Sequence, residues 1–139
     1  MVILVIIGIV PSFIVKNVVV NSYETRAVSI REVNLKNQCD ILGNQLMKEN
    51  YLREPDSDVI NGELSMLSAI YNGRILIINK DAKIIKDTYD IDVGKYALSE
   101  EVIQCFEGKS TANYDDKNAY IEMTSPITKM DSNTIEGVM

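Results

Sequence analysis

The stretch Gly73-Arg-Ile-Leu-Ile-Ile-Asn-Lys-Asp-Ala-Lys-Ile-Ile-Lys-Asp-Thr88 decides the fold, because it holds two β-branched runs separated by a short polar turn. Both faces of the first run carry apolar side chains, which is typical of a strand inside a covered sheet. The second run, residues 83–88, mixes isoleucines with charged residues, as expected of a strand nearer a sheet edge. We therefore predict a β-hairpin whose turn places Ala82 at a left-handed position, where glycine is more usual.

Composition limits the function. The chain has 139 residues and a net charge of −6, and Lys16 is the one charged residue among the first twenty. An acidic domain repels phosphate backbones, so we expect no nucleic-acid partner. The absence of histidine excludes Ser-His, Cys-His and His-metal chemistry within the chain. No GxGxxG nucleotide-binding motif is present either. We therefore predict that this chain is not an enzyme and binds no metal and no cofactor.

The two cysteines, Cys39 and Cys105, form no CxxC pair, so neither a zinc site nor thioredoxin-like exchange is indicated. A disulfide between them is possible outside the cell, but the sequence does not imply one. Both lie among apolar neighbours, which favours buried thiols that pack as small hydrophobes. We assign neither cysteine a function.

The chain begins with an apolar run. Residues 1–15 contain no charge, and residues 18–20 extend the run beyond Lys16 to about the length that a bilayer requires. A secretory signal peptide is the alternative, but the run lacks a preceding basic segment and a small-x-small cleavage site. We therefore predict a partial transmembrane segment at residues 1–20 and a domain at residues 21–139 outside the cytoplasm. Positive charge does not indicate the orientation here.

A long helix is predicted over residues 21–50, continuing directly from the apolar run, because this segment contains no proline and one glycine. Val28, Leu35 and Leu42 recur every seven residues and form a narrow apolar seam. Further apolar residues widen the seam into a stripe: Ile30, Val33, Ile41 and Met47. Such a stripe can pack against the sheet of its own domain, against the same helix of a second copy, or against both.

The remaining segments alternate between helices, turns and strands. Pro55 ends the long helix, and a second helix is predicted at residues 59–71. A polar connection follows the hairpin, and a capped helix closed by glycine comes next. The predicted later segments are the connection 89–98, the helix 99–108, and strands at 111–114, 119–128 and 135–139, the last cut short by the chain end. This order predicts an α+β fold with an antiparallel sheet as its middle layer.

Several positions together resemble a known family. They are the opening stretch, Gly94-Lys95, Ser99-Glu-Glu-Val102, Gly108-Lys109, Ser125-Pro-Ile127 and Glu136-Gly-Val138. Over residues 21–139 they resemble the extracytoplasmic PAS-like sensor domains, of the Cache or PDC type, of bacterial membrane sensor histidine kinases. The resemblance implies a PAS-like antiparallel five-stranded sheet with a long N-terminal helix. Ala82 departs from the pattern, and the Arg-aromatic-Asp set by which some relatives bind amino acids is missing.

The same resemblance implies a function. A domain of this kind senses a small molecule or a protein partner and passes a displacement along its helices to a kinase across the membrane. It also implies a homodimer that forms through the N-terminal helix. Similar modules precede chemoreceptor and cyclic-dinucleotide output domains, so these outputs remain alternatives. A membrane-anchored structural domain without a ligand is a further alternative.

The resemblance places a ligand pocket between the sheet and the segments that follow the hairpin. These segments are rich in tyrosine, whose apolar ring and hydroxyl suit a small polar pocket. Arg74 begins the first strand and is a candidate partner for a ligand carboxylate, or for a nearby Asp or Glu. The candidate ligand-binding residues are Arg74, Tyr89, Tyr96, Tyr114, Tyr120 and Glu122. An ordinary sheet surface is the alternative interpretation of the tyrosines.

Overall fold

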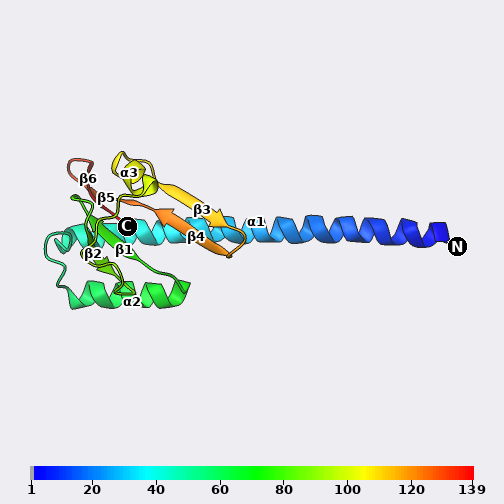
Figure 1. Cartoon of the computed structure of the whole chain (residues 1–139), viewed down its shortest axis with the longest axis horizontal. Helices are drawn as coiled ribbons and strands as arrows, with labels where there is room; N and C mark the ends of the chain where they lie inside the picture. Colours follow the sequence, from blue (N-terminus) through cyan, green and yellow to red (C-terminus); the bar gives the residue numbers. More distant parts are fainter. Residues whose placement is uncertain (1) are drawn as a thin grey trace. The chain divides into compact units, whose positions relative to one another are not determined.

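The structure is a computed structural model that describes the backbone of residues 2–139 and the side chains of residues 15, 16 and 18–139. The chain divides into two units, Met1–Leu35 and Lys36–Met139. The elements are α1 (Val2–Lys48), α2 (Asp58–Tyr71), β1 (Leu76–Asn79), β2 (Ile84–Asp87), α3 (Glu100–Phe106), β3 (Thr111–Asp115), β4 (Tyr120–Thr124), β5 (Pro126–Lys129) and β6 (Thr134–Val138) (Figure 1). The predicted α+β class and the long N-terminal helix are confirmed.

The predicted membrane anchor requires correction. In the part of the chain whose side chains are described, no helix is long and apolar enough to cross a membrane. That part of α1 carries charges at Lys16, Glu24 and Arg26, which a membrane interior disfavours. The predicted membrane localisation, which rested on this anchor and placed residues 21–139 outside the cytoplasm, is therefore corrected, because the described residues do not support a membrane-spanning anchor. The side chains of residues 1–14 and 17, which made up most of the predicted span, lie outside the described residues.

The strands are divided over two antiparallel sheets. One sheet has four strands in the order β2-β1-β6-β5, and the other is the hairpin β3-β4. The strands therefore do not form the predicted single five-stranded sheet. The predicted strand at 119–128 is interrupted at Ser125 and becomes β4 and β5. Pro126 follows and has no backbone N–H to donate to a ladder. Ser125 and Met139 instead exchange a pair of backbone hydrogen bonds, each 2.9 Å long.

The hairpin predicted at the centre of the sequence is confirmed. β1 and β2 pair antiparallel, and β2 lies at the edge of its sheet, as its charged residues indicated. Ala82 takes a positive φ of 59°. The Asn79 side chain supports the turn, because its Oδ1 accepts hydrogen bonds from the N–H groups of Asp81 at 3.1 Å and Lys83 at 3.0 Å.

Two hydrophobic clusters pack on opposite faces of the four-stranded sheet. One joins the last turns of α1 to α2 and the sheet: Leu42, Leu46, Tyr51, Ile60, Leu64, Leu67, Ile77 and Ile127. The other joins α3 to the sheet: Ile78, Ile84, Val102, Cys105 and Val138. Ile77 and Ile78 are neighbours in β1 and belong to different clusters, because successive side chains of a strand point to opposite faces. The sheet is therefore the middle layer of this unit.

Both cysteines are free thiols. Cys105 is buried in the cluster beneath α3, and Cys39 is partly buried on α1. Burial raises the pKa of the Cys39 thiol to about 11, with a further contribution from the negative charge of Asp40. Burial also raises the pKa of the Cys105 thiol. Neither thiol is in the reactive thiolate form at neutral pH.

Candidate functional site

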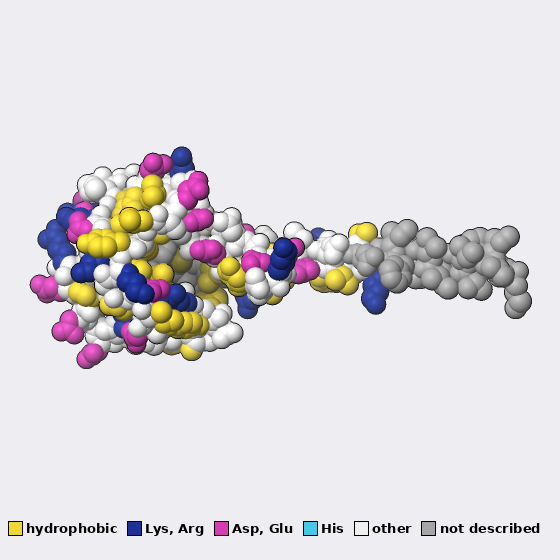
Figure 2. Space-filling view, viewed as in Figure 1, with side chains coloured by type: hydrophobic (Ala, Val, Ile, Leu, Met, Phe, Trp, Pro, Cys, Tyr) yellow, Lys and Arg dark blue, Asp and Glu magenta, His cyan; other side chains and the backbone are white. Residues whose placement is uncertain are grey.

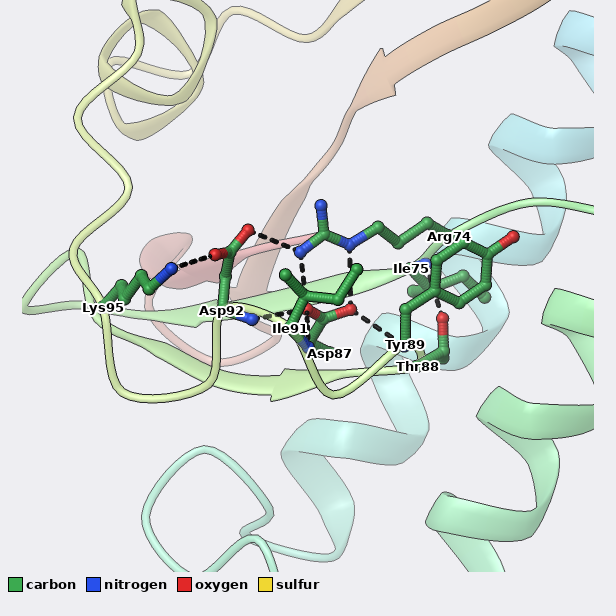
Figure 3. Close-up of polar contacts among 8 residues, drawn as sticks. All are labelled: Arg74, Ile75, Asp87, Thr88, Tyr89, Ile91, Asp92 and Lys95. Carbon is green, nitrogen blue, oxygen red and sulfur yellow. Dashed lines mark hydrogen bonds and ion pairs between the residues drawn. The ribbon is translucent and has the colours of Figure 1, made fainter.

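The most elaborate polar arrangement of the domain surrounds Asp87, the last residue of β2 (Figure 3). Its side chain has no exposed surface. Its Oδ1 accepts a hydrogen bond from Arg74 Nε at 2.9 Å, and its Oδ2 accepts one from Arg74 Nη2. The carboxylate also accepts from the backbone N–H groups of Tyr89 at 2.9 Å, Ile91 at 3.0 Å and Asp92 at 2.9 Å. A buried carboxylate with this many donors is fully satisfied.

Arg74 and Lys95 extend this arrangement to a second carboxylate. Arg74 Nη2 lies 2.6 Å from Asp92 Oδ2, and Lys95 Nζ lies 2.6 Å from Asp92 Oδ1. We call the four residues Arg74, Asp87, Asp92 and Lys95 the clasp. The clasp ties Arg74, two residues before β1, to the loop after β2, so it fixes the middle of that loop to the sheet.

The clasp holds its carboxylates ionised. The hydrogen bonds from Arg74 are the main cause that lowers the pKa of Asp87 far below its usual range, and the backbone N–H groups add to the effect. The pKa of Asp92 is lowered, first by Lys95 and then by Arg74. The pKa of Arg74 is raised, first by Asp87 and then by Asp92. These three groups keep their charges at neutral pH and are not suited to exchange protons there.

The loop that follows β2, residues 88–98, presents apolar side chains to solvent. We call it the clasped loop. Tyr96 is 66% exposed and Leu98 is 68% exposed, and the other large apolar residues at the surface of the loop are Tyr89, Ile91 and Val93. Its backbone is also bonded to β2, because the N–H of Gly94 donates to the carbonyl of Ile84 at 2.8 Å. Five exposed apolar side chains on one ordered loop make it a candidate contact surface.

Other exposed apolar side chains lie on the visible face of the same unit in Figure 2. On α2, Val59 and Met66 are exposed. These belong to a regular helix, whereas the clasped loop holds its apolar residues through a charged network. The clasped loop is therefore the stronger candidate for a functional surface.

The six predicted site residues do not form one pocket. Arg74 is engaged by two carboxylates, which is the alternative that the sequence left open. Tyr89 and Tyr96 are on the clasped loop, and both are exposed. The other three predicted residues are on the separate hairpin: Tyr114, Tyr120 and Glu122.

The register of the hairpin separates these three residues. Tyr114 pairs with Ile121, whereas Tyr120 pairs with Asp115 and Glu122 pairs with Asn113. Tyr114 therefore points to the opposite face of the hairpin from Tyr120 and Glu122. Tyr120 and Glu122 share an exposed face.

Sequence reasoning missed the two carboxylates of the clasp. Asp87 was assigned to an edge strand as one of its charges, and Asp92 was part of a polar connection. One available signal was Asp87 at a strand end with Gly94 a few residues later, which is typical of an Asx-type loop. Among the described residues, no group of acidic or cysteine side chains is arranged to hold a metal ion.

No family model and no curated protein matches this chain.

Proposed function

We propose that this chain is the signal-sensing module of a two-component sensor histidine kinase, with the PAS-like, Cache-type fold that its sequence resembles. The observation that carries the proposal is the burial of the last turns of α1 in the domain core. Leu42 is 1% exposed and Leu46 has no exposed surface, and both pack with residues of α2 and the sheet. A displacement within the domain thus acts directly on the helix, which extends back to Val2.

The strand order supports the PAS-like assignment. β4 and β5 are separated by Ser125 alone, and Ser125 continues the pairing of the sheet through Met139. If β4 and β5 are counted as one bent strand, the two sheets contain the five strands that the resemblance implies. The bent strand then joins the hairpin to the four-stranded sheet.

The clasped loop is the proposed contact surface for the signal, which is a small molecule or a protein. The clasp connects this loop to the start of β1 through Arg74, and β1 pairs with β6, which pairs with β5. Ile127 of β5 lies against Gly43 of α1, where a Cβ built on the glycine would be 4.0 Å from two side-chain carbons of Ile127. The proposed relay therefore runs from the clasped loop, through the sheet, to α1.

The proposed module forms a homodimer through α1. Leu42 of the predicted seam is buried in the core of its own chain, so it is not available to contact a second copy. Ile30 and Val33 are 63% and 57% exposed and are the proposed contacts in the first unit. Single cysteines at Ile30 are expected to cross-link between copies more strongly than cysteines at Ser29. Equal cross-linking at both positions would contradict a specific pairing of helices.

The output domain is tested by reading the coding sequence that follows Met139. We expect a helix with a phosphoacceptor histidine and an ATP-binding domain. A chemoreceptor or cyclic-dinucleotide domain would overturn the kinase assignment while retaining a sensory role. A gene with no output domain would contradict the proposal and favour the structural alternative.

The contact surface is tested in the full-length protein with the double variant Tyr96→Ser and Leu98→Ser. The matched control is Val59→Ser with Met66→Ser, which also removes two exposed apolar side chains. We expect the loop variant to change autophosphorylation, by about tenfold or more in the presence of cell extract, and the control to leave it unchanged. Equal responses of the two variants would contradict a contact at the loop.

A further inference from the structure

A hollow of about 260 Å³ lies where three segments of the second unit meet. Its lining comes from the residues after α1, from the β1–β2 turn and from β6: Leu52, Arg53, Asn79, Lys80, Asp81 and Glu136. None of the predicted site residues and none of the clasp residues lines it. It is therefore separate from the clasped loop.

The walls of the hollow are fixed by the backbone. Tyr51 has no exposed surface, and its hydroxyl donates to Asn61 Oδ1 at 2.6 Å, which anchors the chain just before Leu52. Leu52 packs over Gly137, where an added Cβ would lie 3.2 and 3.3 Å from the Leu52 methyl carbons and 2.5 Å from the carbonyl oxygen of Ile78. The site of Gly137 therefore needs a residue without a side chain.

Glu136 is aimed by a β-bulge. Ile127 of β5 pairs with Gly137, and Thr128 pairs with Ile135, so Glu136 is an extra residue in β6. A bulge of this kind redirects a side chain, and bulges are common next to functional sites. Across the hollow, the Asn79 side chain fixes the turn that carries Lys80.

The hollow is lined by equal numbers of cationic and anionic side chains, and these do not form ion pairs with one another. Two are cationic, Arg53 and Lys80, and two are anionic, Asp81 and Glu136. Among the described residues, none of the four is within 4.0 Å of an oppositely charged group. Charges of both signs around one hollow complement a molecule that carries both signs itself.

We infer that this hollow binds a small zwitterion, whose carboxylate contacts Arg53 and Lys80 and whose ammonium contacts Glu136 and Asp81. The volume is below the range of about 300–1,000 Å³ that is usual for drug-sized ligands, which favours a molecule with few heavy atoms. A ligand here would join the end of α1 to β6. This inference does not depend on the proposed kinase output or on the clasped loop.

The test is a calorimetric or NMR titration of the purified chain with glycine, L-alanine, L-glutamine and β-alanine. Acetate and methylammonium serve as probes that carry one charge each. We expect at least one zwitterion to bind about tenfold or more tightly than either single-charge probe. No binding by any of the four zwitterions, or equal binding by acetate, would overturn the inference.

Variants locate the site. Arg53→Gln and Glu136→Gln are each expected to weaken binding of that zwitterion by about tenfold or more, because each removes a charge-assisted hydrogen bond. The matched controls are Arg31→Gln and Glu107→Gln, which replace exposed residues outside the hollow. Lys80→Gln provides a second variant on the exposed turn if Glu136→Gln does not fold. Binding unchanged in Arg53→Gln and Lys80→Gln would overturn the site, whatever the outcome of the tests of the clasped loop.

Discussion

Asp87 and Asp115 each occupy the last position of a strand and accept hydrogen bonds from the backbone of the loop that follows. Asp87 ends β2 and accepts from N–H groups of the clasped loop. Asp115 ends β3, and its Oδ1 accepts from the N–H groups of Lys117 at 2.9 Å and Asn118 at 3.1 Å. Both loops thus begin with the same device, an aspartate that substitutes for backbone acceptors.

The two aspartates differ in their surroundings. Asp87 is inaccessible to water and has Arg74 as a bidentate partner. Asp115 is partly exposed, and its further partner is the neutral side-chain amide of Asn118 at 2.7 Å. Removing a buried carboxylate leaves several donors without acceptors, whereas water replaces an exposed one. An aspartate that accepts hydrogen bonds from the following loop therefore contributes strongly to stability only where its carboxylate is buried and paired with a cation.

The largest expected effect is that of Asp87→Ala. The substitution leaves three backbone N–H groups and Arg74 without their buried acceptor, so we expect it to lower the free energy of unfolding by about 3–5 kcal/mol. Urea unfolding followed by circular dichroism measures the change. A loss no larger than that of Asp115→Ala would remove the distinction between the two loops.

Arg74→Ala is expected to have the next largest effect. It leaves the buried charge of Asp87 with backbone donors only, at a cost of about 2–3 kcal/mol. Arg74→Lys should restore part of the loss, because lysine supplies the charge but not the bidentate geometry. The same unfolding measurement applies to both variants. An Arg74→Ala protein as stable as the parent would contradict the contribution of Arg74 to the clasp.

Acid should destabilise the protein by protonating Asp87, which holds the clasped loop. The pKa of Asp87 is depressed in the folded state, so the unfolded chain binds the proton more readily. The contribution of Asp87 is therefore fully present above its unfolded pKa of about 3.9 and is lost as the pH falls below that value. Unfolding free energies measured between about pH 6 and pH 3 should decline more steeply in the parent protein than in Asp87→Ala. Parallel declines would contradict the depressed pKa.

Asp115→Ala should have the smallest effect. Its carboxylate is replaced by water, so we expect the melting temperature to remain within about 2 °C of that of the parent. Differential scanning calorimetry measures the difference. A change as large as that of Asp87→Ala would show that exposure does not separate the two loops.

The sequence predicted the local structure well where one short pattern determines it. The β1–β2 hairpin and the positive φ of Ala82 follow from β-branched runs around a polar turn. The alternation of Ile77 and Ile78 between two clusters follows from the period of a strand. These features depend on neighbouring residues, which the sequence shows directly.

The sequence predicted less where distant residues decide the outcome. Asp87 became buried because Arg74 and the loop amides surround it, and no local pattern gives that burial. The interruption at Ser125 divided one predicted strand over two sheets. The register of β3 against β4 placed Tyr114 on the opposite face from Tyr120, which separated residues that a shared composition had grouped. Pairing partners and burial are properties of the assembled sheet.

The central claim is that the clasp holds its loop as an ordered surface, and native-state hydrogen exchange tests it most directly. The amide protons of Ile91 and Asp92 donate to the buried Asp87, and those of Lys117 and Asn118 donate to Asp115. We predict that the Ile91 and Asp92 amides exchange only by openings that approach global unfolding, while the other pair exchanges through low-energy local openings. Equally rapid exchange of all four amides would contradict the account.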